Sequence, residues 1–119
     1  GPNYDAASIA KAMETIRGEM PADSAAAHGL IVDCSHGNSG KDEHRQAEVV
    51  RNIAGRIAQG EEGITGIMME SFIEGGNQKA APLDRLVYGR SITDKCLSWD
   101  TTERLLRELA HAVSERRWK

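Results

Sequence analysis

Two short apolar runs separated by a helix pattern constrain most strongly how this chain can fold. Residues 29–34 contain the β-branched pair Ile31 and Val32, and residues 63–70 (GITGIMME) are almost continuously apolar. Apolar runs of this length are typical of strands that are buried on both faces. Because the runs alternate with helices, we expect parallel strands joined by a right-handed crossover. The predicted fold class is therefore α/β.

Helix patterns flank both predicted strands. In residues 5–20 apolar side chains recur with helical spacing after a possible N-cap, Asp5, and a second helical pattern covers residues 41–59. A third helix is predicted to begin at Asp100, which forms a capping-box pattern with Glu103. Residues 71–99 lie between the second strand and this helix, and we expect a long, functional loop there with at most a short hairpin.

Two strands alone cannot form a sheet that is buried on both faces. We therefore expect residues 1–119 to be one segment of an incomplete α/β domain, cut from a barrel or an open sheet, or else to associate and cover its edges. The first residue, Gly1, also favours a trimmed or excerpted chain over a complete one.

Charge and hydropathy argue against several classes of function. The net charge is -3 with acids and bases interspersed, so a nucleic-acid partner is not expected. No apolar run approaches the ~20 residues that cross a bilayer, and no secretory signal is present, so we predict a cytoplasmic protein without membrane contact. The two cysteines, Cys34 and Cys96, are predicted to be reduced thiols.

Three polar side chains near the apolar runs are the candidates for chemistry. His36 follows the first run, Glu70 ends the second, and Asp94 lies in the SITD stretch of the long loop. Since the carboxyl ends of parallel strands share one edge of a sheet, His36 and Glu70 are expected on the same side. One imidazole with two carboxylates suits a divalent ion such as Mn²⁺ or Fe²⁺.

Each candidate also has a purely structural interpretation. A single histidine after a strand is commonly a hydrogen-bonded loop residue, and Asp94 could cap a short turn. Glu70 is the sharper candidate, since a buried carboxylate needs a partner. Cys34 could share a face with His36 and act as a fourth ligand, or fill the core as an apolar residue. Solvent exposure explains the other histidines: His28, His44 and His111.

Four stretches of the chain together carry a family resemblance: GPNY at 1–4, VDCSHGNSGK at 32–41, GIMMESFIEGGNQ at 66–78 and LVYGRSITDKCLSW at 86–99. In this order they resemble the C-terminal part of class I 3-deoxy-D-arabino-heptulosonate 7-phosphate synthase, also called phospho-2-dehydro-3-deoxyheptonate aldolase. The resemblance implies the C-terminal portion of a (β/α)₈ TIM barrel, about strands seven and eight with helices six to eight and an insertion after strand eight. A whole barrel takes about 250 residues.

The resemblance also implies the chemistry. The family is a metal-dependent transferase that joins phosphoenolpyruvate to erythrose 4-phosphate, the first step of the shikimate pathway to chorismate and the aromatic amino acids. Its metal-binding histidine matches His36, its glutamate Glu70 and its aspartate Asp94, and His36 is also the candidate catalytic residue. The fourth ligand is a cysteine from an earlier part of the barrel, which argues against Cys34. Ser35 and Asn38 are candidates for orienting the ligands.

The same resemblance places the groups that hold both substrate phosphates before the GPNY stretch, so we expect this chain to be inactive alone. The implied partners are phosphoenolpyruvate, erythrose 4-phosphate and the rest of the barrel, and a homo-oligomer is expected. Two other functions stay open from the residues: a non-catalytic half barrel that self-associates, and an acidic metal-binding module.

Overall fold

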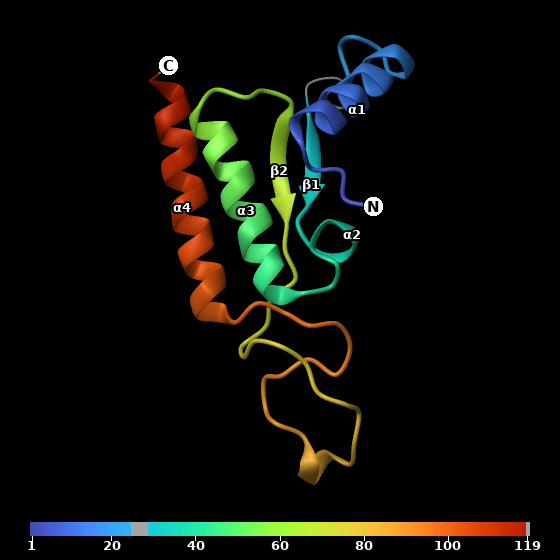
Figure 1. Ribbon diagram of the computed structural model, residues 1–119, viewed down its shortest axis with the longest axis vertical. Helices are drawn as coiled ribbons and strands as arrows, with labels where there is room; N and C mark the ends of the chain where they lie inside the picture. The colour runs from blue at the N-terminus through green and yellow to red at the C-terminus, as the bar shows by residue number, and fades with distance from the viewer. Residues whose placement is uncertain (25–28, 119) are drawn as a thin grey trace.

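The alternation of strands and helices that the sequence predicts is present in the computed structural model, which describes residues 1–24 and 29–118. His28, predicted to face solvent, lies outside these residues. The elements follow one another as labelled in Figure 1: α1 (Ala6–Glu19), β1 (Leu30–Asp33), α2 (His36–Ser39), α3 (Glu43–Ala58), β2 (Ile64–Met68), the 3₁₀ turn η2 (Leu83–Arg85) and α4 (Trp99–Arg117).

The strands β1 and β2 pair in parallel, as predicted, with α3 as the crossover between them. Leu30 lies opposite Ile64 and Asp33 opposite Met68, with one irregularity in the register. The pairing continues one residue past β1, where the Cys34 N–H donates to the Met68 carbonyl over 2.9 Å. Both strands therefore end at the same edge of the sheet, and the chain segments that follow them start side by side.

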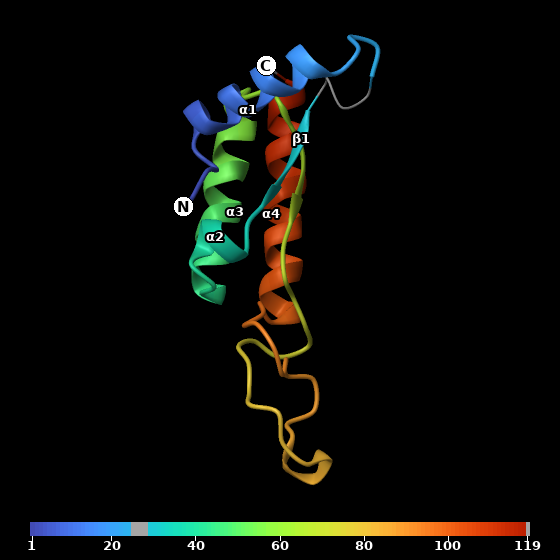
Figure 2. The ribbon, with the colours of Figure 1, turned by 90° about the vertical axis from the view of Figure 1, so that its right-hand side faces the viewer.

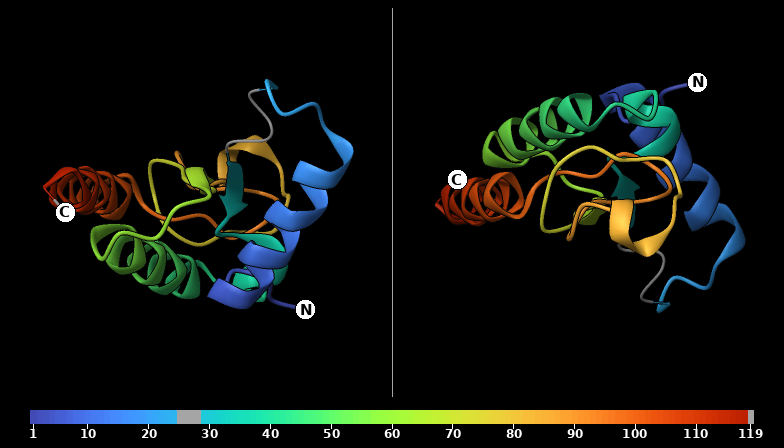
Figure 3. Two further views of the ribbon diagram at one scale, coloured as in Figure 1. Left: turned by 90° about the horizontal axis from the view of Figure 1, so that it is seen from above. Right: turned by 90° about the horizontal axis from the view of Figure 1, so that it is seen from below.

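Helices cover only one face of this sheet. In Figure 2 α3 and α4 lie on one side of the strands, and seen along the long axis α1, α3 and α4 form an arc around them (Figure 3). Val32, Ile53 and Leu105 belong to the buried core between the strands and these helices. On the opposite face Ile31 is 68% exposed and Met68 40% exposed. The expectation of strands buried on both faces is thus wrong for this chain by itself, because none of the residues that the structure describes covers the second face.

The helix starts are set by side-chain caps. Asp5 caps α1 as predicted, because its carboxylate accepts from the Ser8 N–H at 3.1 Å. The predicted capping box at Asp100 is wrong: α4 begins two residues after Leu97, and its N-cap is Ser98, whose hydroxyl accepts from the Thr101 N–H at 3.2 Å. Asp100 lies instead in the first turn, where its charge interacts favourably with the helix dipole.

The long loop forms an arm that extends from the carboxyl end of the sheet (Figure 1). Residues 71–98, all of them described, form the predicted long loop without a strand, and η2 is the regular element of the arm. In place of a hairpin the loop has isolated bridges, among them an antiparallel one between Gly76 and Cys96. The Gln78 side chain ties the arm together, since it bonds the backbone of Val87 and the Arg90 carbonyl, each over 2.9 Å.

Two further predictions concern the described chain as a whole. Cys34 and Cys96 are both free, as expected. Among the described helices, none combines the length and the apolar character that a membrane span requires.

Candidate metal site

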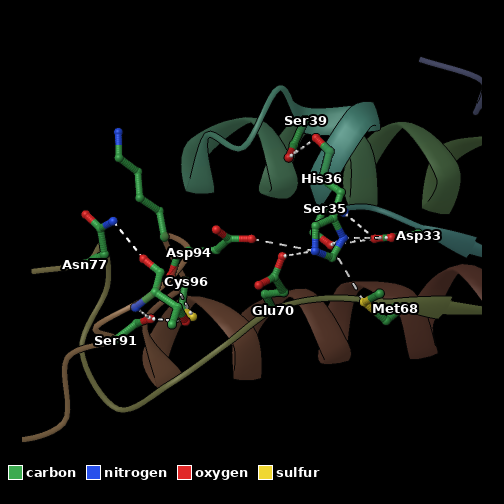
Figure 4. A network of polar contacts seen from close by, with 12 residues as sticks. Asp33, Ser35, His36, Ser39, Met68, Glu70, Asn77, Ser91, Asp94 and Cys96 are labelled. Atoms are coloured by element: carbon green, nitrogen blue, oxygen red, sulfur yellow. Dashed lines mark hydrogen bonds and ion pairs between the residues drawn. The ribbon is translucent and has the colours of Figure 1, made fainter. Parts of the chain in front are cut away.

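The structure brings His36, Glu70 and Asp94 together at the carboxyl edge of the sheet (Figure 4). The His36 Nε2 atom lies 3.1 Å from Glu70 Oε1 and 3.7 Å from Asp94 Oδ2. One ligand atom from each of the three side chains falls within 4.8 Å of the others. In the part of the chain that the structure describes, this is the one group of three or more such side chains that could hold a metal ion.

His36 reaches the cluster through an unusual backbone conformation. It is the first residue of α2, the single helical turn that occupies the predicted turn after β1, and its φ is 47°. Residues other than glycine rarely adopt this left-handed region, and such residues gather at functional sites. The turn is closed by Gly40, also left-handed at φ 61°, whose N–H bonds the His36 carbonyl.

Glu70 and Asp94 are brought together by the return of the long loop. The Leu97 N–H donates to the Glu70 carbonyl and the Phe72 N–H to the Leu97 carbonyl, each over 2.9 Å. The returning segment therefore runs beside the residues that follow β2. The Asn77 side chain holds the same segment by donating to the Thr93 carbonyl over 2.9 Å. These contacts place Asp94 opposite the end of β2.

A carboxylate that the sequence did not single out holds the imidazole. Asp33 Oδ2 lies 2.9 Å from His36 Nδ1, and Asp33 Oδ1 accepts from the Ser35 hydroxyl at 2.5 Å. Asn38 donates to the Asp33 carbonyl over 2.8 Å. Ser35 also contacts the imidazole directly, since its Oγ lies 2.9 Å from His36 Nδ1, whereas Asn38 reaches this network through the Asp33 carbonyl. The available signal was an acid three residues before the histidine at a strand end.

This network changes the pKa values of its two ionisable partners. The hydrogen bond to Asp33 is the largest influence that raises the pKa of His36 above its ordinary value, followed by the charge of Glu70. Burial is the largest single influence on Asp33 and raises its pKa, but the hydrogen bonds from Ser35 and His36 together outweigh it and hold the pKa below its ordinary value. The surroundings of the imidazole thus favour positive charge.

Cys34 does not belong to the cluster. Its side chain is fully buried in the core, and its thiol lies 3.8 Å from the Val32 carbonyl. Burial raises the pKa of the Cys34 thiol to about 12, while metals bind the thiolate form. The alternative of Cys34 as a fourth ligand is therefore wrong, and the side chain is an apolar filler of the core.

The donor set and its spacing fit a divalent cation. Ligands about 2.1 Å from an ion lie about 3.0 Å apart at neighbouring octahedral positions and about 3.4 Å apart in a tetrahedron. The separation of 3.1 Å from His36 Nε2 lies between these values, and that of 3.7 Å is nearer to the tetrahedral one. The side chains of His36, Glu70 and Asp94 are 46%, 25% and 41% exposed, so the cluster stays open to solvent. An imidazole and two carboxylates suit ions of the Mn²⁺ and Fe²⁺ kind.

Comparison with known proteins gives one consistent family. Residues 1–107 match the DAHP synthetase I family. The chain is 50% identical over 124 residues to phospho-2-dehydro-3-deoxyheptonate aldolase of Corynebacterium glutamicum, which covers 98% of this chain and 32% of that protein. It is 46% identical over 116 residues to the Trp-sensitive phospho-2-dehydro-3-deoxyheptonate aldolase of Escherichia coli (strain K12), with 97% and 32% covered.

A solved structure agrees with these sequence relatives. The structure of phospho-2-dehydro-3-deoxyheptonate aldolase from Francisella tularensis SCHU S4 superposes with a TM-score of 0.85 at 35% identity and covers 98% of this chain. The match takes in 32% of that chain. The protein described here thus spans about a third of the length of the relatives that it matches.

Proposed function

Because this chain belongs to the DAHP synthetase I family, we propose that residues 1–119 form the C-terminal segment of a (β/α)₈ barrel. In this assignment β1 and β2 are strands seven and eight, and α1, α3 and α4 are helices six to eight. The arm before α4 is then the insertion after strand eight. The open second face of the sheet supports the assignment, because in a closed barrel that face lines a filled interior.

The proposed activity is the condensation of phosphoenolpyruvate with erythrose 4-phosphate to 3-deoxy-D-arabino-heptulosonate 7-phosphate. The observation that carries the proposal is the convergence of His36, Glu70 and Asp94 beyond the carboxyl ends of two parallel strands. Enzymes with this fold place their active sites at that edge. The names of the relatives agree with this reaction.

His36, Glu70 and Asp94 are the proposed ligands of a divalent ion, Mn²⁺ or Fe²⁺. Bound there, the ion supplies a Lewis acid that stabilises negative charge on an oxygen of the reacting aldehyde. The protein's own contribution is to orient the ligands. Asp33 bonds Nδ1 of His36 and thereby directs Nε2 towards the two carboxylates. Such a carboxylate selects the tautomer and orientation of a ligating histidine.

His36 is also the proposed catalytic residue. Its imidazole lies between Asp33 on one side and the two carboxylates Glu70 and Asp94 on the other. Its catalytic contribution would be to hold the ion at the reacting aldehyde, because Nε2 is the proposed ligand atom and Nδ1 is bonded to Asp33. Asp33 stabilises the protonated ring, as the raised pKa of His36 reflects.

The chain is proposed to be inactive alone and to need the rest of the barrel as a partner. The relatives are about three times as long as the match, so residues 1–119 correspond to about a third of such an enzyme. The homo-oligomer and the cytoplasmic location stay predictions.

A chimaera tests the proposed function directly. The matching third of the Corynebacterium glutamicum relative is replaced by residues 1–119, which are 50% identical to it. We expect phosphate release from phosphoenolpyruvate that depends on erythrose 4-phosphate and on Mn²⁺, and we expect Glu70→Gln to abolish it. The matched control is His44→Ala, because the His44 side chain is 88% exposed and outside the cluster. A folded chimaera without activity would count against the assignment.

A second function has one observation in its favour. The exposure of Ile31 at 68% and Met68 at 40% leaves an apolar sheet face uncovered, and open sheet surfaces and edges promote association. We propose as the alternative a non-catalytic half barrel that self-associates through this face. Sedimentation of the 119-residue chain distinguishes the two, because a monomer at high concentration contradicts the alternative.

A further inference from the structure

Among the described residues, Gln46 has the largest polar side chain that is fully buried, and it is 1% exposed. It lies at the end of the first turn of α3. Its Oε1 atom accepts from the Glu70 N–H at 3.0 Å, and its Nε2 atom lies 3.5 Å from the Lys95 carbonyl, a long contact. Burial of an amide is costly unless it is hydrogen-bonded, so both ends of this side chain have a partner that offsets the cost.

The two partners of Gln46 are the backbone segments that carry two of the proposed ligands. Glu70 is a ligand itself, and Lys95 directly follows Asp94. Neither segment belongs to a regular element: β2 ends at Met68, and Asp94 lies in the arm. Pairing with β1 therefore does not determine where the Glu70 side chain points. Gln46, by contrast, is on a helix packed into the core, which makes it a common rigid reference for both segments.

We propose that Gln46 is a positioning residue that sets the separation of the Glu70 and Asp94 carboxylates. The inference rests on the proposed metal site and extends it to a residue on α3 that touches no ligand atom. Outer partners that orient metal ligands typically contribute 10–100-fold to metal affinity. Without the amide, the end of β2 and the returning arm lose their shared contact, and the two carboxylates no longer converge in the folded protein before the ion binds.

The test compares Gln46→Met with the wild-type segment in the chimaera that carries residues 1–119. Methionine has a similar length and fills the same buried space without either hydrogen bond. We expect Mn²⁺ affinity, measured by titration calorimetry and by the loss of the free-ion EPR signal, to fall at least about 10-fold. We also expect the Glu70 amide to exchange its hydrogen faster, because its acceptor is gone.

The matched control is Ile53→Val, on the same helix and in the buried core, two turns further along. It removes one buried methylene and leaves the Gln46 amide in place, so the Mn²⁺ affinity of the folded fraction should stay at the wild-type value. A purely structural role for Gln46 predicts the same behaviour for Gln46→Met. Affinity at the wild-type value in folded Gln46→Met, with the Glu70 amide still protected, overturns the inference and leaves the metal site intact.

Two other outcomes are equally decisive. If the chimaera with the wild-type segment binds no Mn²⁺, the proposed site fails and the inference fails with it. If Gln46→Met does not fold, Gln46→Asn replaces it, since asparagine keeps the amide but is too short to reach both segments. The same loss of affinity is expected for Gln46→Asn, and unchanged affinity would overturn the role of Gln46.

Discussion

The two halves of the candidate site are held in different ways. On one side, the imidazole of His36 is oriented by contacts within a few residues of itself, from Asp33 three residues before it and Ser35 next to it. On the other side, Glu70 and Asp94 depend on contacts between distant segments. The bond from the Glu70 N–H to Gln46 spans 24 residues, and that from Gln46 to the Lys95 carbonyl spans 49.

This difference has a physical consequence. A contact between neighbours in the chain orders few residues, whereas a contact across a long loop also carries the entropy of closing that loop. The His36 half should therefore form whenever β1 and α2 form. The carboxylate half needs α3, β2 and the returning arm in place together. We expect the site to fail first at Glu70 and Asp94 when the fold is weakened.

The largest effects are expected from two single variants, one that removes a ligand from the His36 half of the site and one that removes a ligand from the carboxylate half. In the chimaera, His36→Ala and Asp94→Ala should each lower the rate of phosphate release by about 1000-fold or more, because the bound ion contributes several kcal/mol. The measurement is the initial rate at saturating Mn²⁺. If His36→Ala lost activity while Asp94→Ala kept full activity, the carboxylate half would play no part in the site, and the comparison of the two halves would be wrong.

A smaller effect is expected from the local support of the imidazole. Asp33→Asn removes the negative partner of Nδ1 and should weaken Mn²⁺ binding about 10–100-fold in titration calorimetry. The ¹⁵N chemical shifts of the His36 ring should report a changed tautomer. Asp84→Asn, at an exposed position in η2, is the control. Wild-type affinity together with unchanged ring shifts would show that Asp33 does not orient His36.

The pH dependence is expected to follow from the raised pKa of His36. A proton on the imidazole competes with the ion, so Mn²⁺ affinity should fall up to about tenfold per pH unit once the pH drops below the folded-state pKa, which lies above 6.5. Without metal, the stability of the fold changes with pH in the opposite direction to the metal affinity. The protonated ring stabilises the fold fully below about pH 6.5, the unfolded value, and this contribution is lost as the pH rises through the folded pKa.

Both signs can be checked in one series of experiments. Titration calorimetry between pH 6 and 8 measures the affinity, and urea unfolding of the metal-free chain measures the stability. Asp33→Asn should move both transitions to lower pH, because the hydrogen bond from His36 to Asp33 is the largest cause of the shift. Transitions that stay in place in Asp33→Asn would contradict the assigned cause.

The smallest effect concerns the junction between the arm and α4. Ser98→Ala removes the N-cap and should lower the free energy of unfolding by about 1 kcal/mol. Asp100→Ala removes only a first-turn charge and should cost less, about 0.3–1 kcal/mol. Urea unfolding of the two variants gives the order. A larger loss of unfolding free energy for Asp100→Ala than for Ser98→Ala would contradict Ser98 as the N-cap.

The parts of the site that could be predicted from the sequence also differ from those that could not in whether their contacts are near or distant in the chain. His36 and Glu70 were named from their positions at strand ends and Asp94 from the long loop, all three with support from the family resemblance, and the structure brings them together. Asp33 was missed although its contact is local, because it lies within the first predicted strand and only the turn that follows brings the imidazole back to its carboxylate. Gln46 could not be found, since nothing in a helical stretch shows that its amide meets Glu70.

The sequence by itself determined the two strands, the three long helices, the parallel pairing and the candidate ligands, because hydrophobic periodicity and strand-end polarity are properties of neighbouring residues. It did not determine which cap starts α4, since Ser98 and Asp100 are both good N-cap types. Only the tertiary structure decided that Cys34 faces the core, that Ile31 is exposed, and that the arm returns Asp94 to His36. Those outcomes depend on packing between segments that are far apart in the sequence, which local patterns do not encode.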